Sequence, residues 1–198
     1  MILRRGKNKS DLIYILFSAV LGLLMGWTAV DFMAYSAIGM LLCNLGLWVF
    51  ITTMLAAYSN DAVRAALHVG VFLACVVTGY YGHFALTGGT LILPHLIANI
   101  FMIAIGALLG FIVWHAGAKE WLGAICISIP VSLIVAECFN LYHRISISLI
   151  FDIAAVILLL VLFAPGRYKK LMAFPFVIVF TFALVYFNVL SGFFGAWI

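Results

Sequence analysis

Charged side chains are scarce in this sequence. Lys, Arg, Asp and Glu make up 8% of its 198 residues, whereas hydrophobic residues make up 68% and the mean hydropathy is +1.30. Soluble domains carry about 25% charged residues. This shortage excludes an ordinary soluble protein and argues against a nucleic-acid partner. It predicts an integral membrane protein whose main partner is the lipid bilayer.

Catalytic and redox motifs are also missing. The chain contains no G-x-S-x-G, no H-E-x-x-H, no paired acidic motif and no nucleotide-binding loop. Its four cysteines show no CxxC spacing. We therefore predict a protein that is not an enzyme and that has no cofactor or metal. Because no linker or internal repeat divides the chain, we also predict a single domain over residues 1–198.

Long apolar runs follow one another along the chain, separated by short polar connections such as "SND" and "PGRYKK". A bilayer core about 30 Å thick needs roughly 20 helical residues. On that scale the sequence predicts an all-α, polytopic transmembrane bundle of seven helices. The helices cover residues 12–30, 34–57, 62–82, 91–114, 121–142, 145–163 and 171–193.

The basic residues predict which end of the bundle faces the cytoplasm. With a cytoplasmic N-terminus, nine of the ten Lys and Arg residues fall on the inner side and one, Arg144, falls outside. The nine are Arg4, Arg5, Lys7, Lys9, Arg64, Lys119, Arg167, Lys169 and Lys170. An odd number of helices then places the C-terminus outside. The basic segments hold this orientation and contact anionic lipid.

Charged residues interrupt the apolar pattern in "AECFNLYHRISISLIFDIA", residues 136–154. In the predicted orientation Glu137 lies near the outer end of the fifth helix, and Asp152 lies near the middle of the sixth. An acid at that depth costs about 2.5 to 3.5 kcal/mol and is by default a functional residue. Arg144, Ser148 and Asp152 are four apart, so they share one helical face.

Other helices, and for His83 the connection after the third helix, add polar residues to the same outer half. They are Asn44, His83, His95, Asn99 and Asn188. One interpretation is an outward-open pocket that binds or transports a small solute or ion. The ligand-binding residues that it predicts are Asp152, Arg144, Glu137, His95, Asn99 and Ser148. In the other interpretation Glu137 and Arg144 form an ion pair, and the polar residues only join helices in a structural or accessory subunit of a membrane complex.

A lesser alternative is an intramembrane Cys/His hydrolase. His68 and Cys75 in "LHVGVFLAC" are seven apart, a spacing similar to that of membrane peptidases that process signalling peptides. The glycine and arginine pattern of those enzymes is missing, and two helical turns separate the side chains by about 10 Å. Both observations count against this alternative.

Small residues recur four apart within several predicted helices, as in Gly22 and Gly26 or Gly106 and Gly110. Such pairs let helix backbones approach closely, within one chain or in a homodimer. We expect packing within the chain. Pro130 lies inside the fifth helix, where Ser128 or Ser132 is placed to satisfy the carbonyl group that the proline leaves free.

The run "NLGLWVFITTMLAAYSNDAVRAALHVGVFLACVVTGYY", residues 44–81, resembles part of a family of uncharacterised small polytopic membrane proteins of Gram-positive bacteria. The resemblance covers about a fifth of the chain and contains no catalytic motif. It implies a multi-pass protein of the bacterial cytoplasmic membrane and assigns no site residue.

Overall fold

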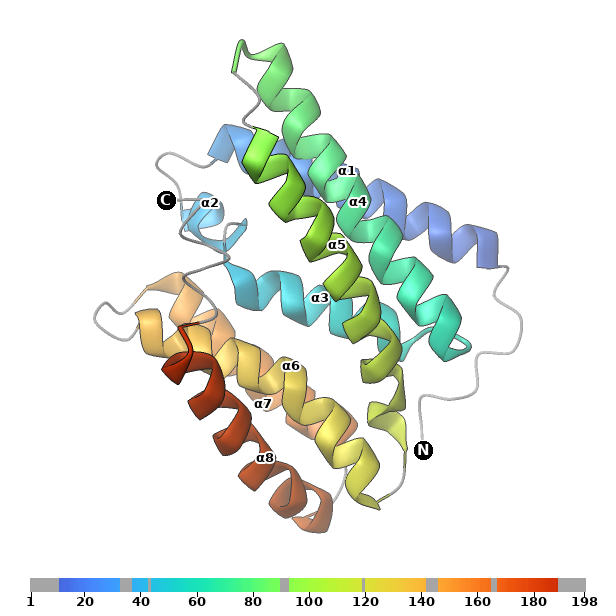
Figure 1. The fold of residues 1–198 in the computed structure, drawn as a ribbon, viewed down its shortest axis with the longest axis vertical. Coiled ribbons are helices and arrows are strands. Elements are labelled where there is room, and N and C mark those ends of the chain that lie inside the picture. The colour runs from blue at the N-terminus through green and yellow to red at the C-terminus, as the bar shows by residue number, and fades with distance from the viewer. Residues whose placement is uncertain are drawn as a thin grey trace. The chain divides into compact units, whose positions relative to one another are not determined.

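The computed structural model of the chain describes residues 11–32, 37–42, 44–89, 93–118, 120–141, 146–164 and 167–188. Within these ranges the regular structure is helical (Figure 1). The helices are α1 (Asp11–Phe32), α2 (Ala37–Leu42), α3 (Leu45–Ala57), α4 (Ala62–Leu86), α5 (Leu93–Trp114), the 3-10 helix η1 (His115–Gly117), α6 (Glu120–Leu141), α7 (Ile147–Phe163) and α8 (Arg167–Tyr186). The predicted all-helical fold is therefore confirmed.

The second predicted helix is interrupted in the structure. Residues 34–57 contain two helices, because α2 ends at Leu42 and α3 begins at Leu45. Four of the described segments are long and apolar enough to cross a membrane, whereas α3, α7 and the apolar part of α8 are shorter. The four are Asp11–Val30, Ala62–Leu86, Leu93–Gly117 and Trp121–Phe139.

The chain divides into two compact units. Unit 1 consists of Met1–Cys43 and Met54–Trp114, and therefore contains α1, α2, the end of α3, α4 and α5. Unit 2 consists of Asn44–Thr53 and His115–Ile198, and contains most of α3 with η1, α6, α7 and α8. The single-domain assignment stays a prediction.

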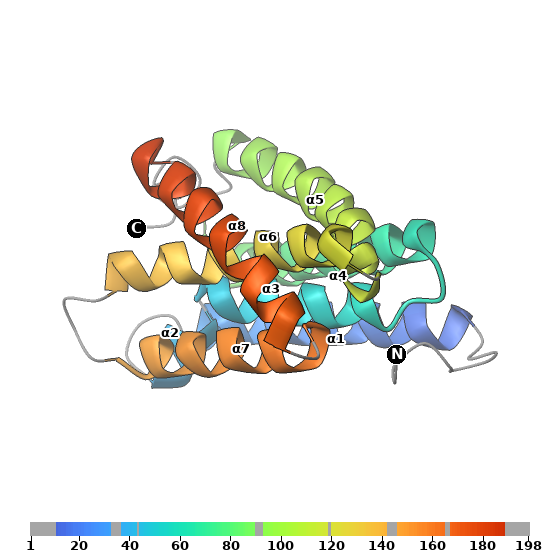
Figure 2. The same cartoon turned by 90° about the horizontal axis from the view of Figure 1, so that it is seen from below.

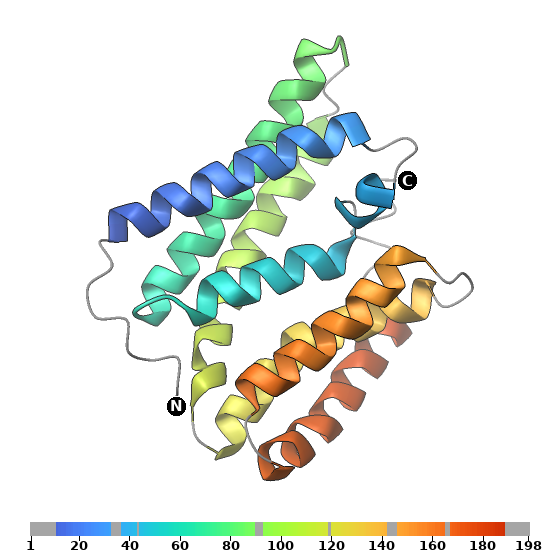
Figure 3. The ribbon, with the colours of Figure 1, turned by 180° about the vertical axis from the view of Figure 1, so that it is seen from behind.

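In unit 1 the backbones of α1 and α4 are in close contact (Figure 3). A Cβ atom added at Gly26 would overlap the carbonyl oxygen of Val76 and lie 3.0 Å from the Tyr80 nitrogen. A Cβ atom added at Gly79 would lie 3.1 Å from the nitrogen of Trp27. Glycine is thus required on both helices for this approach, as in small-residue contacts between membrane helices.

The α4–α5 contact in unit 1 uses small residues in the same way. A Cβ atom at Gly110 would lie 2.9 Å from Val69 Cγ2 and 3.2 Å from the Ala65 carbonyl oxygen. Gly70 is less crowded, since its added Cβ would lie 3.5 Å from that of Ala107. Among the described glycines of unit 1, those that face a neighbouring helix at short range are Gly22, Gly26, Gly79, Gly106 and Gly110. The expected use of these residues in packing within the chain is confirmed.

The end of α4 differs from the prediction. The helix continues four residues beyond the predicted end at residue 82, so His83 lies within α4 and not in the connection that follows it. Its side chain is buried, its Nδ1 donates to the carbonyl oxygen of Trp27 over 2.9 Å, and its ring stacks on the Trp27 indole with centroids 4.4 Å apart. His83 therefore joins α4 to α1.

In unit 2, hydrogen bonds from buried hydroxyl groups link α6 to α8, which cross in Figure 2. Ser128 Oγ lies 2.6 Å from the Ala124 carbonyl oxygen and 3.1 Å from that of Ala173 on α8. Thr181 on α8 donates to the Ser132 carbonyl oxygen over 3.5 Å. The sequence predicts that Ser128 or Ser132 satisfies the carbonyl group left free by Pro130. Ser128 instead donates to α8 and to the preceding turn of α6. Hydroxyl groups of this kind hold helices together in an apolar medium.

Lys169 has a structural role that its position among basic residues did not indicate. Its ammonium group donates to the carbonyl oxygens of Ala116 and Ala118, each over 2.9 Å. Both carbonyl groups lie at the end of η1, where the last carbonyl groups of a helix have no intrahelical donor. Burial lowers the pKa of Lys169 from its usual value, with a smaller opposing effect from Cys126.

Candidate functional site

Asn44 is the N-cap residue of α3. Its side-chain oxygen accepts a hydrogen bond from the Leu47 amide over 2.8 Å. Asparagine is among the preferred residues at this position, because its side chain satisfies an amide that has no partner within the helix. The side chain is 3% exposed, so α3 begins at a buried position inside a stretch that hydropathy predicts to be one continuous helix.

Glu137 of α6 completes the cap. One carboxylate oxygen accepts from the Leu45 amide over 2.8 Å, and the other accepts from the Gly46 amide over 2.5 Å. Both amides belong to the first turn of α3, where the helix dipole places partial positive charge. Both oxygens of Glu137 therefore accept hydrogen bonds from amides at the positive end of α3.

Asp152 of α7 lies against this cap and has no exposed surface. Its Oδ2 accepts from the Asn44 side-chain amide over 3.1 Å. Its Oδ1 is buried and has no hydrogen-bond partner among the described residues. A Cβ atom added at Gly46 would overlap Oδ1 and lie 2.9 Å from the Asn44 Oδ1 atom, so glycine at this position makes room for the acid.

Asn44, Gly46, Glu137 and Asp152 together form the capped-acid site, which lies entirely within unit 2. Two of the three residues of the predicted polar face, Ser148 and Asp152, lie on the buried side of α7, and the third, Arg144, lies outside the described residues. The Asp152 side chain is fully buried in the described structure, so the predicted outward-open pocket stays a prediction.

The other predicted ligand-binding residues lie elsewhere. His95 and Asn99 belong to unit 1, where the Asn99 amide donates to the Tyr81 hydroxyl over 2.8 Å and to the His95 carbonyl oxygen over 2.9 Å. Asn99 is buried and His95 is half-buried. Asn188 lies exposed after α8, with a φ of 51°. Arg144 lies outside the described residues. The structure therefore brings Glu137 and Asp152 together, and adds Asn44 and Gly46.

The signal for the helix break was present in the sequence. Asn44 and Gly46 in "CNLGLW" combine a strong N-cap residue with a glycine two positions later. The apolar residues on both sides concealed the break. The second half of the cap is supplied by Glu137, which lies more than ninety residues further along the chain. No local pattern therefore contains the complete cap.

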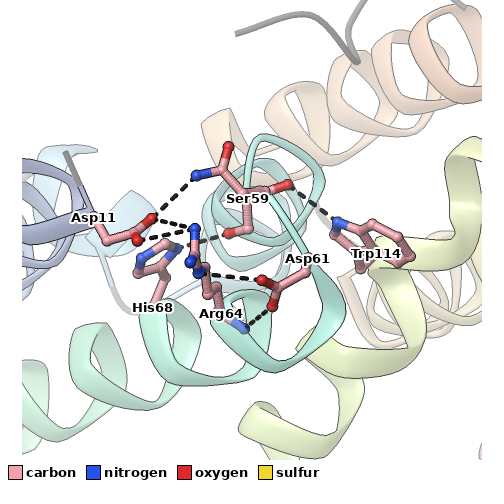
Figure 4. Close-up of polar contacts among 7 residues, drawn as sticks. Asp11, Ser59, Asp61, Arg64, His68 and Trp114 are labelled. Atoms are coloured by element: carbon pink, nitrogen blue, oxygen red, sulfur yellow. Dashed lines mark hydrogen bonds and ion pairs between the residues drawn. The ribbon is translucent and has the colours of Figure 1, made fainter. Parts of the chain in front are cut away.

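Unit 1 contains a second polar cluster at the start of α1 and α4 (Figure 4). Arg64 contacts both oxygens of Asp11 over 2.9 Å and contacts Asp61 over 3.1 Å. Asp61 also accepts from the Arg64 amide over 2.8 Å and is the N-cap residue of α4. The salt-bridge side chains are about 40% exposed. Ion pairs with this exposure contribute at most about 1 kcal/mol.

Ser59 and His68 form the buried part of the same cluster. Ser59 Oγ lies 2.7 Å from the Leu55 carbonyl oxygen and 2.7 Å from His68 Nδ1. A carbonyl oxygen can only accept a hydrogen bond, so the Ser59 hydroxyl donates to Leu55. His68 Nδ1 then carries a proton and donates to the Ser59 oxygen. His68 Nε2 then carries a lone pair, which is buried and has no partner in the described parts of the chain.

Replacing Ser59 by alanine tests this assignment. We expect S59A to lower the free energy of unfolding by about 1 to 2 kcal/mol, because the His68 Nδ1–H loses its acceptor. The midpoint of thermal unfolding in detergent should fall by about 3 to 7 °C. S18A is the control, since the buried Ser18 hydroxyl donates to the Tyr14 carbonyl oxygen of its own helix. Equal effects of the two changes would contradict the assignment.

His68 does not support the hydrolase alternative. Its Nδ1 faces Ser59, whereas Cys75 lies against the α1 backbone at the point where a Cβ on Gly22 would be 3.0 Å from Cys75 Cβ. The described residues also contain no group of three or more His, Cys, Asp or Glu side chains that could hold a metal ion.

The apolar helices and the buried polar groups define the class: the chain is a helical membrane protein. Comparison with protein-family models, with curated proteins and with solved structures finds no match to this chain. The argument for function therefore depends on the residues of the site.

Proposed function

We propose that the protein is a multi-pass membrane protein that binds or transports a small ion, with Asp152 as the ion-binding group. The observation that carries this proposal is the side-chain oxygen Oδ1 of Asp152, which is fully buried and has no partner in the described structure. An unpartnered buried oxygen costs about 1 to 3 kcal/mol, and more if it is charged. A bound ion at Oδ1 removes this cost.

The surroundings of Asp152 support the proposal. Gly46 leaves the space in which Oδ1 lies, and the Asn44 amide orients the carboxyl group through Oδ2. Acidic residues within membrane-spanning helices are rare and mark ion pathways more often than they serve packing. Interrupted helices are also typical of ion sites in transporters. The start of α3 at the buried Asn44 cap, inside a stretch that hydropathy predicts to be one helix, supports a site of this kind.

The proposed setting follows from the sequence. The Lys and Arg distribution supports a cytoplasmic N-terminus and an external C-terminus. The resemblance of residues 44–81 supports the cytoplasmic membrane of a bacterium. In this orientation the ion reaches the capped-acid site from the outer side, after a change of conformation that exposes Asp152.

A structural or accessory subunit is the second candidate. It is favoured by the complete burial of Asp152 and by its hydrogen bond to Asn44, which together join α7 to the start of α3. In this case the acid stabilises the fold, and a partner membrane protein supplies the activity.

Reconstitution into lipid vesicles distinguishes the two candidates. We expect the purified protein to carry H⁺ or Na⁺ across the bilayer, and we expect D152N to lose at least about tenfold in flux while it keeps its folded yield. Fluxes are measured with a trapped pH-sensitive dye for H⁺ and with radioactive Na⁺. D61N is the matched control, because asparagine also caps helices and should leave the flux unchanged. Unchanged flux in D152N, or no flux in the parent protein, would exclude the ion-transport proposal.

A further inference from the structure

The two acids of the capped-acid site have unequal partners. Glu137 accepts two backbone amide hydrogen bonds, one on each oxygen, at the positive end of α3. Asp152 accepts one hydrogen bond from the neutral amide of Asn44, and its other oxygen has no partner in the described structure. The hydrogen bonds of the site therefore favour a negative charge on Glu137 over one on Asp152.

A metal cation fits this arrangement poorly. Na⁺, Ca²⁺ and similar ions need several oxygen ligands at about 2.3 to 2.6 Å. The Asn44 side-chain oxygen already accepts from Leu47, and both oxygens of Glu137 already accept from α3. Asp152 Oδ1 is the one side-chain oxygen of these three residues without a hydrogen bond. A proton needs one oxygen, so it is the ion that this site accommodates.

We propose that the ion bound at the capped-acid site is a proton, held on Asp152 while Glu137 stays ionised. This inference rests on the function proposed above and names its ligand. Release is a simple dissociation: the Oδ1–H bond breaks, the electron pair stays on Asp152, and the proton leaves to water or to a carrier base. No oxidant or other reactant is needed.

The groups around Asp152 determine how loss of its proton affects the stability of the site. Glu137 and Cys138 of α6 interact with its charge, and the start of α3 contributes the uncharged Asn44 and Gly46. Loss of the proton places a second carboxylate near Glu137 in an apolar environment, where like charges repel strongly. The deprotonated site is thus destabilised until it is hydrated or protonated again, which couples proton release to opening of the site.

Two isosteric changes test the assignment of charge. D152N imitates the protonated acid, so the midpoint of thermal unfolding should stay within about 3 °C of the parent value. E137Q places an amide group against the two amide donors of α3, so its midpoint should fall by about 5 to 10 °C. The reverse order, with D152N strongly destabilised and E137Q unaffected, would overturn the proposal.

Infrared spectroscopy of the full-length protein in lipid gives a readout that does not depend on folding of E137Q. At pH 7 the parent and D61N should show the C=O stretch of a buried protonated carboxylic acid, and D152N should have lost it. A parent without this band, or a band that persists in D152N, contradicts the proposal. If the band is present but no H⁺ flux is measured, Asp152 is a protonated acid and the transport proposal is excluded. If the band is absent and a flux of Na⁺ depends on Asp152, the ion-transport proposal stands and the assignment of the ion as a proton is excluded.

Discussion

Replacing Gly26 by valine should abolish the folded state of unit 1. The added Cβ atom would overlap the Val76 carbonyl oxygen and would lie 2.9 Å from its carbonyl carbon. These are backbone atoms of α4, so no side-chain rotation relieves the overlap and the two helices must separate. Overpacking costs about 1 to 3 kcal/mol even where side chains adjust, and we expect more than about 3 kcal/mol here. Total stabilities are only about 5 to 15 kcal/mol.

The matched control for G26V is G82V on α4. A Cβ atom at Gly82 meets no atom within 4 Å, so this change tests the same substitution without a contact. Valine and glycine differ little in helix propensity, and G82V should keep the stability of the parent within about 0.5 kcal/mol. The measurement is the yield of monodisperse protein in detergent and its thermal unfolding midpoint. Normal yield and midpoint for G26V would show that α1 and α4 do not pack through Gly26.

Replacing Gly46 by alanine should disrupt the capped-acid site. The new Cβ atom would overlap Asp152 Oδ1 and displace the carboxyl group from Asn44. Loss of the buried hydrogen bond and the steric overlap should together cost about 3 to 4 kcal/mol. Alanine gains about 1 kcal/mol in helix propensity, so the expected net loss is about 2 to 3 kcal/mol. The thermal midpoint should fall by about 4 to 10 °C.

G70A is the control for G46A. The added Cβ of Gly70 would lie at an ordinary contact distance of 3.5 Å from that of Ala107, so the gain in helix propensity should leave the midpoint unchanged or slightly raised. G46A should also lose H⁺ flux in vesicles, whereas G70A should retain it. A stable G46A protein with normal flux would show that Asp152 does not occupy the space beside Gly46.

Much of the helical architecture follows from the sequence because it depends on local periodicity. Ser148 and Asp152 are four apart, and the structure buries both on one face of α7. The paired glycines likewise predicted close helix contacts. Each of the seven predicted stretches contains helix in the described residues, and the second contains both α2 and α3.

The capped-acid site was only partly predictable for a physical reason. Its two acids stand out as charges in an apolar chain, so Glu137 and Asp152 were found. The apolar pattern predicts Asn44 to lie inside a helix, because the backbone amides that Asn44 and Glu137 satisfy cannot be told from other amides in the sequence. Lys169 was missed as a cap of η1 because a basic residue beside a membrane helix is already explained by lipid and orientation.

The glycine contact between α1 and α4 also constrains how the protein is made. The ribosome releases α1 before α4, and residues 33–61 separate the two helices in the chain. During that interval Gly22 and Gly26 lack the α4 backbone that they contact in the folded chain. The α1–α4 contact can therefore form only after α4 has been synthesised, so the first helix waits for its partner.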